Sequence, residues 1–572
     1  MPLSYDTPEI FRWTVEKIVV IGPGIVGMPM AALLAHARIR EGTDRPANVV
    51  VIQRESKTSG WKVPAINAGR SPIGGVEPDL DRIVAEPVAA GLLRASHDYS
   101  EASDADVILV CVQTDKKELA PDYGPLMESL DALAQALRGK PTQNIPLIIF
   151  ESTLAPSTMT TVIRQHFERN GLHEGKDILL GNSPNRVMPG RLVERVAASD
   201  KIVAGLHPLT PQLIGRLYRH IVTGGTLHPT NSMTAEVVKT LENAYRDVRI
   251  AFAAEIVRYC DAQDLDFYAV REGVNHRIAQ TDGASLDPNV VPSGAVLVPT
   301  VGVGGHCLPK DGILLWWRKL ESGADTSRSL ILEARRINDE SPSETLRLAE
   351  RAFGDLAGKS VAVMGASYRF DSEDTRNSPA LVLARLLLGK GCSVTLHDPY
   401  VKPDDQNLLR FGLERIFTQD FELALRDAEV AFFCTGHRVY VETRGGIAEV
   451  APRLRALIDG ANLFHREDFT GTAFGYAGIG RGRRQPSPAF LSFVLEAFQT
   501  MERGLSNELL DLIRILNDRY ATEAFNQIDF EEVRRIAGTC VTGCAITKPE
   551  PVGHAPSYEG FMPRLSSLAA GA

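Results

Sequence analysis

The segment from Pro299 to Leu315, PTVGVGGHCLPKDGILL, combines the residue types that nucleophilic chemistry needs. Cys307 follows two glycines and His306, and Lys310 and Asp311 come three and four residues after it. A lone cysteine is most often an inert core residue, but nearby positive groups and an accessible turn lower a thiol pKa. A thiolate next to a nicotinamide could capture an aldehyde covalently during its oxidation. Cys307 is therefore the candidate nucleophile.

A nicotinamide requires a dinucleotide site, and the segment from Lys17 to Ala35 has the pattern of one. A short β-branched run leads into a glycine turn, and a stretch rich in Ala and Leu follows, which predicts strand, turn and helix. In this motif the glycines allow a tight turn and close approach of the backbone to a pyrophosphate at the helix N-terminus. The predicted cofactor-binding residues of the turn are Gly22, Gly24, Ile25, Val26 and Gly27.

A second predicted strand, 48–52, ends without the acidic residue that usually binds the ribose 2′-hydroxyl group. Gln53 and Arg54 follow it, and we predict that both contact the cofactor. Gln53 can hydrogen-bond a ribose, whereas Arg54 tolerates a 2′-phosphate, so NAD is expected with NADP left open. The alternative is that both are ordinary solvated loop residues.

Further apolar strands are predicted at 107–112 and 145–150, with helical patterns between them. Alternating strands and helices indicate a doubly wound parallel sheet, whose ligands bind beyond the carboxyl ends of the strands. Thr114, Glu151 and Thr153 fall at those ends, and we predict that Thr114 and Glu151 contact the cofactor. A second, smaller sheet of the same type is predicted from Lys359 onward, with strands near 361–364, 392–397 and 429–434.

A helix is predicted from 234 to 262 because apolar residues recur there with a period close to 3.6. Lys239, Asn243 and Arg246 form a separate polar stripe along it. Most such stripes are solvated faces, but a helix this long could bridge two domains and line a cleft between them.

Composition limits the functional classes. The chain has 572 residues, a formal net charge of −9 and seven cysteines, an odd number spread along the sequence. These values argue against a nucleic-acid binder and against a disulfide framework. We predict no metal site, because Cys540 and Cys544 lack a second Cys or His pair nearby. No leader or membrane-spanning pattern is evident, so a cytoplasmic protein with no membrane partner is expected.

Several ordered motifs together resemble the UDP-glucose/GDP-mannose dehydrogenase family of nucleotide-sugar 6-dehydrogenases. They are GPGIVG at 22–27, ESTLAPST at 151–158, SPNRVMPG at 183–190, KTLENAYRDVRIAFAAE at 239–255 and VGVGGHCLPKD at 301–311. Further along, GASYRFDSEDTRNSPA at 365–380, HDPYV at 397–401 and GYAGIGRG at 475–482 resemble the nucleotide-sugar domain of the family. Within the family, the ESTLAPST and SPNRVMPG motifs are most similar to the branch that acts on UDP-N-acetylhexosamines, UDP-ManNAc or UDP-GlcNAc, which we expect in preference to UDP-glucose.

The resemblance implies two Rossmann-like domains joined by a long helix that also forms a homodimer core. It implies oxidation of the C6 alcohol of a UDP-sugar to a uronic acid, with two NAD⁺ used in succession and Cys307 carrying a thiohemiacetal and then a thioester. The matching catalytic positions are Cys307, Lys239, Asn243, Asp311 and Thr153. The matching substrate positions are Asn185, Arg186, Arg277, Gly304, Tyr368 and Arg369, and Arg376 matches a cofactor-contacting arginine. A role in cell-surface polysaccharide synthesis would follow.

The chain departs from the family in three places. Asn185 replaces a glutamate implicated in proton transfer, Gln53 replaces the ribose-binding acid, and residues 485–572 extend beyond the pattern. We therefore keep two alternatives: a single two-electron oxidation that releases an aldehyde or ketone, and a non-catalytic nucleotide-sugar or dinucleotide binder. The expected domains are 1–230 for the dinucleotide, 231–340 for the central helices and cysteine loop, 341–484 for the nucleotide sugar, and a mainly helical extension, 485–572.

Overall fold

The computed structural model describes residues 13–74, 77–138, 145–186, 190–278, 295–540 and 543–571. The chain divides into two units, each built from three segments. The first unit comprises Met1–Glu242, Ile313–Ala324 and Leu510–Ile546, and the second comprises Asn243–Gly312, Asp325–Leu509 and Thr547–Ala572. Residues 1–12, where no leader was predicted, lie outside the described residues.

The first unit contains the predicted doubly wound sheet. Its strand order is β10-β9-β8-β7-β4-β1-β2-β3, and every pair is parallel except β8 with β9. The chain reverses its direction of progress between β1 and β4, which is where doubly wound sheets bind ligands. The strands are β1 (Lys17–Ile21), β2 (Asn48–Ile52), β3 (Leu93–Ser96), β4 (Val107–Val110), β7 (Leu147–Phe150), β8 (Leu179–Asn182), β9 (Lys201–Gly205) and β10 (Leu227–Asn231). A small hairpin, β5 (Asp115–Lys117) and β6 (Ala120–Asp122), follows β4.

The strands predicted around β4 and β7 are shorter in the structure. β7 starts at Leu147 because Pro146 has no N–H to give the ladder. β1 and β2 begin and end as the β-branched runs predict.

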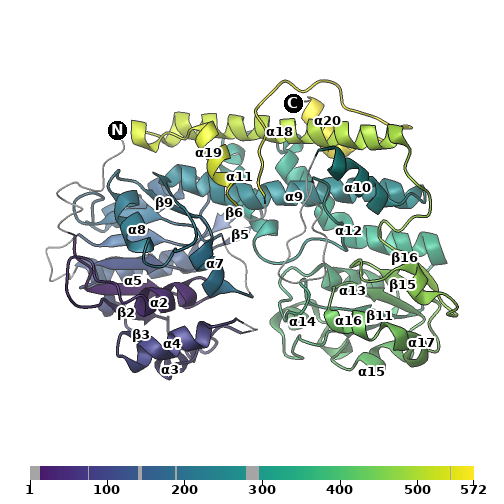
Figure 1. The fold of residues 1–572 in the computed structure, drawn as a ribbon, viewed down its shortest axis with the longest axis horizontal. Helices are drawn as coiled ribbons and strands as arrows, with labels where there is room; N and C mark the ends of the chain where they lie inside the picture. Colours follow the sequence, from purple (N-terminus) through teal and green to yellow (C-terminus); the bar gives the residue numbers. More distant parts are fainter. Residues whose placement is uncertain are drawn as a thin grey trace. The chain divides into compact units, whose positions relative to one another are not determined.

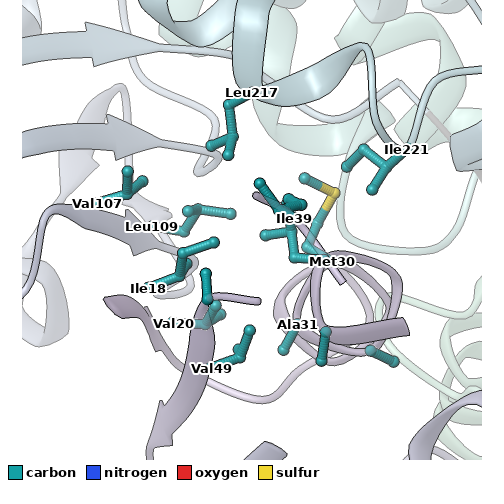
Figure 2. Packing of buried hydrophobic residues seen from close by; sticks show 14 of the residues in the cluster. Ile18, Val20, Met30, Ala31, Ile39, Val49, Val107, Leu109, Leu217 and Ile221 are labelled. Atoms are coloured by element: carbon teal, nitrogen blue, oxygen red, sulfur yellow. The ribbon is translucent and has the colours of Figure 1, made fainter. Parts of the chain in front are cut away.

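Helices cover both faces of this sheet (Figure 1). Side chains alternate along β1, so that Ile18 and Val20 pack against α2 (Gly27–His36) while Val19 and Ile21 pack on the opposite face. Figure 2 shows the first set meeting Met30 of α2. Each such fully buried aliphatic side chain contributes roughly 1.5–3 kcal/mol to folding. The other helices are α3 (Lys62–Asn67), α4 (Leu80–Ala89), α5 (Gly124–Arg138), η2 (Met159–Arg164), α6 (Gln165–Arg169), α7 (Leu192–Ala198) and α8 (Thr210–Tyr218).

The second unit contains the second predicted sheet, which is entirely parallel with the order β13-β12-β11-β14-β15-β16. The reversal point lies between β11 and β14. The strands are β11 (Ser360–Met364), β12 (Ser393–His397), β13 (Phe417–Thr418), β14 (Val430–Phe433), β15 (Ala456–Asp459) and β16 (Gly475–Gly478). The helices around it are α12 (Leu330–Phe353), α13 (Pro379–Gly389), α14 (Gln406–Phe411), α15 (Phe421–Leu425), α16 (Arg438–Glu442) and α17 (Ile447–Val450). The predicted class, two Rossmann-like sheets, is confirmed.

The predicted long helix is α9 (Ser232–Ala262), which begins two residues earlier than its apolar pattern suggests. It begins in the first unit and ends in the second, whereas α11 (Leu308–Glu321) begins in the second and ends in the first. A shorter helix, α10 (Phe267–Arg277), follows α9.

The C-terminal extension is helical, as predicted, with α18 (Pro488–Tyr520), α19 (Phe530–Ala537) and α20 (Arg564–Gly571). Within the second unit α18 packs on α9, where the rings of Phe252 and Phe498 lie 5.6 Å apart and Tyr245 donates a hydrogen bond to Glu502. The apolar stripe of α18, from Phe490 to Ile513, is buried. Because α18 covers this part of α9, the face is occupied by the chain itself. The homodimer stays a prediction.

Among the described residues, none of the helices has the length and apolar character that crossing a bilayer requires.

Candidate active site

The glycine turn after β1 has the geometry of a pyrophosphate cradle. Gly22 has φ +93°, and a Cβ there would lie 2.9 Å from the carbonyl oxygen of Cys111. A Cβ on Gly27 would lie 2.1 Å from the carbonyl oxygen of Gly22, so helix and strand pack too closely for any side chain. A Cβ on Gly24 would meet nothing within 4 Å. Two glycines therefore shape the turn, and the third leaves one side open for a ligand.

The helix that follows suits an anion. α2 has no acidic residue in its first turn and no side-chain cap at Val26, so its partial positive N-terminal end is not compensated by the protein. Ile25, in the same turn, is exposed. These residues fit a dinucleotide pyrophosphate.

The end of β2 is held by a hydrogen bond within its own loop and by an ion pair with α5. The Gln53 amide donates to Ser59 Oγ at 3.0 Å, and Arg54 forms an exposed ion pair with Glu128. Lys62, which sequence reasoning missed, donates from Nζ to the Pro23 carbonyl oxygen in the glycine turn at 3.3 Å. Burial lowers the pKa of Lys62. A cation therefore lies against the turn that would receive the pyrophosphate.

Thr153 lies in a loop that the first unit holds in place. Thr114 Oγ1 donates to the Thr153 carbonyl oxygen at 2.6 Å, which joins two positions predicted separately from strand ends. Further along the loop, Ser157 has φ +68°, a left-handed conformation that costs energy in a residue with a Cβ. Glu236 of α9 accepts hydrogen bonds from the N–H groups of Ser157 and Met159, at 2.7 and 2.8 Å.

A second clamp on this loop comes from α11. Arg318 donates to Ser157 Oγ at 2.8 Å and to Thr161 Oγ1 at 2.6 Å, and it is 7% exposed. Burial raises the pKa of Glu236 to about 8, against the lowering effect of the hydrogen bonds and of Arg318. The helices that carry the candidates Lys239 and Asp311 thus each supply one residue that holds the Thr153 loop.

Glu151 is turned into the first unit. Its carboxylate pairs with Lys201 at 2.8 Å and accepts a hydrogen bond from Tyr218, and all three side chains are buried. Lys201 also donates to the Ser183 carbonyl oxygen at 3.1 Å, so this cluster supports the SPNR segment. Contact between Glu151 and the cofactor stays a prediction.

Arg186 is equally enclosed. Its guanidinium pairs with Glu242 at 2.7 Å, and the two side chains are 4% and 3% exposed. It also donates to Thr539 Oγ1 at 3.0 Å and to the Ile536 carbonyl oxygen at 3.2 Å. Burial raises the pKa of Glu242, while the charges of Arg186 and Lys239 oppose the shift. Contact of Arg186 or its neighbour Asn185 with substrate stays a prediction.

Cys307 lies in the second unit and is the exposed one among the seven cysteines, all of which fall within the described ranges. It immediately precedes α11, and its carbonyl oxygen accepts the N–H groups of Lys310 and Asp311 at 3.1 and 2.8 Å. The positive end of a helix stabilises a thiolate at its N-terminus. An exposed sulfur at this place is suited to act as a nucleophile.

Asp311 and Asn243 meet in the second unit. The Asn243 amide donates to Asp311 Oδ2 at 2.6 Å, and Asp311 is fully buried. Lys310 Nζ lies 3.7 Å from the other carboxylate oxygen. Lys239 stands one helical turn before Asn243 on α9 and is 7% exposed. The structure therefore brings α9 and the cysteine segment together at two of the predicted residues.

The cysteine loop rests on Tyr368 and the residues around Arg376. A Cβ on Gly304 would lie 2.3 Å from the Cβ of Tyr368, so only glycine fits there. Gly305 N–H donates to the Arg376 carbonyl oxygen at 2.7 Å, and Asn377 donates back to the Gly305 carbonyl oxygen at 2.9 Å. The Arg376 guanidinium pairs with Asp374.

A cavity of about 390 Å³ opens beside this loop, at the carboxyl ends of β11 and β14. Tyr368, Ser367 and Thr435 line it. Asp398 holds the backbone of the lining residue Ser367, whose N–H it accepts at 2.9 Å, and it also accepts a hydrogen bond from His437 Nε2 at 3.0 Å. The volume and position suit a nucleotide.

Two other predicted substrate residues belong to the second unit, and one of them, Arg369, lies in sequence between the cavity-lining residues Tyr368 and Phe370. The Arg369 guanidinium lies over the ring of Phe370, 5.5 Å from its centroid. Arg277, at the end of α10, is exposed and donates to Ser492 Oγ of α18 at 3.1 Å.

Comparison with known proteins supplies the family. Residues 16–222 match the NAD binding domain of the UDP-glucose/GDP-mannose dehydrogenase family, 233–340 match its central domain, and 362–466 match its UDP binding domain. The chain belongs to this family. The dehydrogenase is therefore an NAD-dependent oxidoreductase, and the cavity beside Tyr368 borders the UDP binding domain.

Individual relatives agree. The dehydrogenase is 31% identical over 471 residues to a UDP-N-acetyl-D-mannosamine dehydrogenase of Pyrococcus horikoshii, covering 82% of this chain and 99% of the relative. It is 29% identical to an NDP-N-acetyl-D-galactosaminuronic acid dehydrogenase of Ralstonia solanacearum, covering 75% and 96%. The crystal structure of an NDP-N-acetyl-D-galactosaminuronic acid dehydrogenase from Methanosarcina mazei is similar with a TM-score of 0.67 and 32% identity, covering 82% and 96%.

Proposed function

We propose that the dehydrogenase oxidises the C6 hydroxyl group of a UDP-N-acetylhexosamine to a carboxylate, with Cys307 as covalent nucleophile. One observation carries the proposal. The exposed Cys307 lies at the N-terminus of α11, in a loop seated on Tyr368 at the nucleotide cavity, and α11 is joined to α9 through Asp311 and Asn243.

The first oxidation needs a group that holds the substrate oxygen as its proton leaves. Lys239 and Asn243 are four residues apart on α9 and so lie on one face, about 6 Å apart along the axis. An ammonium and an amide N–H are suited to stabilise a developing oxyanion. Bound NAD⁺ supplies the hydride acceptor for each of the two oxidations.

The second oxidation uses the sulfur of Cys307. Its thiolate attacks the C6 aldehyde carbon, and the carbonyl π electrons move to oxygen to give the alkoxide form of a thiohemiacetal. Loss of a hydride from C6 then gives a thioester. Attack of water on the thioester carbon releases the carboxylate and returns the thiol. Asp311 orients Asn243 by accepting its amide N–H. The family resemblance assigns Thr153, whose carbonyl oxygen accepts a hydrogen bond from Thr114, the ordering of this water.

Asn185 favours one alternative outcome. An amide takes no proton near neutral pH, so removal of a proton from the hydrolytic water lacks the expected carboxylate. The reaction would then stop after one two-electron oxidation, or the enzyme would accumulate as the thioester at Cys307.

The preference for an N-acetylhexosamine rests on the relatives, whose names specify N-acetylmannosamine and N-acetylgalactosaminuronic acid. A role in making uronic acids for cell-surface polysaccharides would follow from that product.

The test is a stoichiometry. The protein is incubated with NAD⁺ and UDP-ManNAc, UDP-GlcNAc, UDP-GalNAc or UDP-glucose, and NADH formed per sugar consumed is counted. We expect two NADH and a uronate from an N-acetylhexosamine, and no uronate from Cys307→Ser. One NADH per sugar indicates the aldehyde or ketone, and wild-type uronate formation by Cys307→Ser contradicts the covalent mechanism.

A further inference from the structure

The part of the C-terminal extension that belongs to the first unit contacts three residues that support the candidate site. Gln527 accepts a hydrogen bond from Asn231 at 2.8 Å, the ring of Tyr520 lies 4.9 Å from the Arg318 guanidinium, and Thr539 accepts one from Arg186. The three residues that the extension contributes, Gln527, Tyr520 and Thr539, lie beyond the stretches that match the family, which end at residue 466.

The contact at Arg186 is the most complete. Its guanidinium is buried and donates to Ile536 and Thr539, which lie at and just beyond the last turn of α19. The carbonyl end of a helix carries partial negative charge and so suits a buried cation. The neighbouring Cys540 raises the pKa of Arg186 and lowers that of Glu242, although burial opposes both effects. The end of α19 thus supplies partners that a buried guanidinium requires.

Arg186 connects this end of α19 to the reacting groups. It follows Asn185 directly in the SPNR segment, and its ion pair with Glu242 reaches α9. Glu242 lies three residues after Lys239 on that helix, and the charge of Lys239 acts to lower the pKa of Glu242. A shift of Arg186 would therefore move Asn185 and change the electrostatic surroundings of Lys239.

The other two contacts act on the same site. Asn231 caps α9 by accepting the Thr234 N–H at 2.8 Å. Arg318 clamps the Thr153 loop through Ser157. Both helices that carry candidate catalytic residues are therefore braced by the extension.

We propose that the extension, through Ile536 and Thr539 at the end of α19, is a positioning element of this dehydrogenase that holds Arg186 and with it Asn185 and Lys239 in their working geometry. The catalytic part of this inference rests on the proposed function. It assigns the segment outside the family pattern a role in the turnover rate rather than in stability alone.

The test compares three full-length variants by kinetics and by hydrogen–deuterium exchange. Thr539→Val removes the hydroxyl that accepts from Arg186, Thr539→Ser retains one, and Thr522→Val is the control at an exposed threonine of the same extension. We expect Thr539→Val to lower kcat about three- to tenfold with little change in KM for NAD⁺. Thr539→Ser should restore the rate, and Thr522→Val should leave it unchanged.

The exchange measurement separates this inference from the proposed function, because it needs no turnover. Thr539→Val should speed amide exchange in the segment 179–186 and leave 17–27 unchanged, with equal melting temperatures. If the wild type oxidises no UDP-sugar, the proposed function fails and the exchange comparison still decides whether Thr539 holds the segment. Two results would overturn the inference. One is amide exchange in 179–186 of Thr539→Val that equals that of the wild type. The other, in an active enzyme, is a kcat for Thr539→Val that equals the kcat for Thr522→Val.

Discussion

At the scale of single residues, Cys307 differs from the other cysteines in exposure. It is exposed, whereas Cys260, Cys392 and Cys544 are buried. Burial also raises the pKa of the Cys392 thiol, which further slows its reaction with alkylating agents. We expect iodoacetamide to label Cys307 first and to abolish activity in step with that labelling, as followed by peptide mass spectrometry.

The matched control for this prediction is Cys392→Ala, which removes a cysteine outside the site. Its labelling and inactivation should follow the wild type. Full activity in protein fully alkylated at Cys307 would show that the sulfur takes no part in turnover.

Asn185 supports a second prediction at this scale. If the missing carboxylate limits proton removal from the hydrolytic water, Asn185→Glu should raise the rate of uronate release about ten- to a hundredfold. Asn185→Gln keeps the amide with the glutamate length and should give no increase. The measurement is single-turnover release of uronate, and equal rates for the two variants would contradict the assignment.

Residue types and order were enough to find the glycine turn and to single out Cys307, Asn243 and Asp311 as candidates, but not to predict the hydrogen bond that joins Asn243 to Asp311. They were not enough to place Glu151 and Arg186, because a charged residue in a motif looks the same whether it faces a ligand or a buried partner. Lys201 and Glu242, their partners, lie 50 and 56 residues away in sequence, and only the fold joins them. Glu236 and Arg318 carried no signal, since the left-handed backbone of Ser157 that they hold is invisible in the sequence.

At the scale of elements, α9 holds the Thr153 loop through a carboxyl group with an altered pKa. Burial raises the pKa of Glu236 to about 8 from an ordinary value of 4.5. The folded protein therefore keeps a proton that the unfolded chain releases above pH 4.5. The contribution of Glu236 to the free energy of unfolding falls as pH rises, by up to about 1.4 kcal/mol per unit, until about pH 8.

Glu236→Gln removes this titration. The free energy of unfolding of the variant, relative to that of the wild type, should therefore rise steadily from pH 5 to pH 8 and then level off. Unfolding in urea at several pH values measures the difference. Glu496→Gln, at an exposed position of α18, is the control and should show no such trend. A difference between Glu236→Gln and wild type that is independent of pH would show that the carboxyl group titrates normally in the folded protein.

Strands and helices were the most predictable elements. β2 and α9 lie within two residues of their predicted ranges, because a β-branched run and a 3.6-residue apolar period determine them locally. The packing of α18 on α9 was not predictable. An apolar stripe indicates that a helix face is buried, but it does not indicate which segment of the chain covers that face.

At the scale of the whole molecule, each unit has its own sheet and its own nucleotide-binding features. The glycine turn belongs to the first unit, and the cavity beside Tyr368 belongs to the second. We expect NAD⁺ alone to slow hydrogen–deuterium exchange in residues 22–27, and UDP alone to slow it in 367–370 and 434–436. Adenosine serves as the control for UDP. Protection of 22–27 by UDP would contradict this division.

The central claim is that C6 of the sugar becomes bonded to the sulfur of Cys307. The most direct measurement is rapid acid quench of the enzyme during turnover of a UDP-N-acetylhexosamine with NAD⁺, followed by mass spectrometry of the peptide that contains residue 307. We predict an adduct with the mass of the substrate less four hydrogen atoms, which is the thioester, and more of it than in Asn185→Glu. Uronate formation with no adduct at Cys307 at any quench time, and with an active Cys307→Ser, would contradict the account.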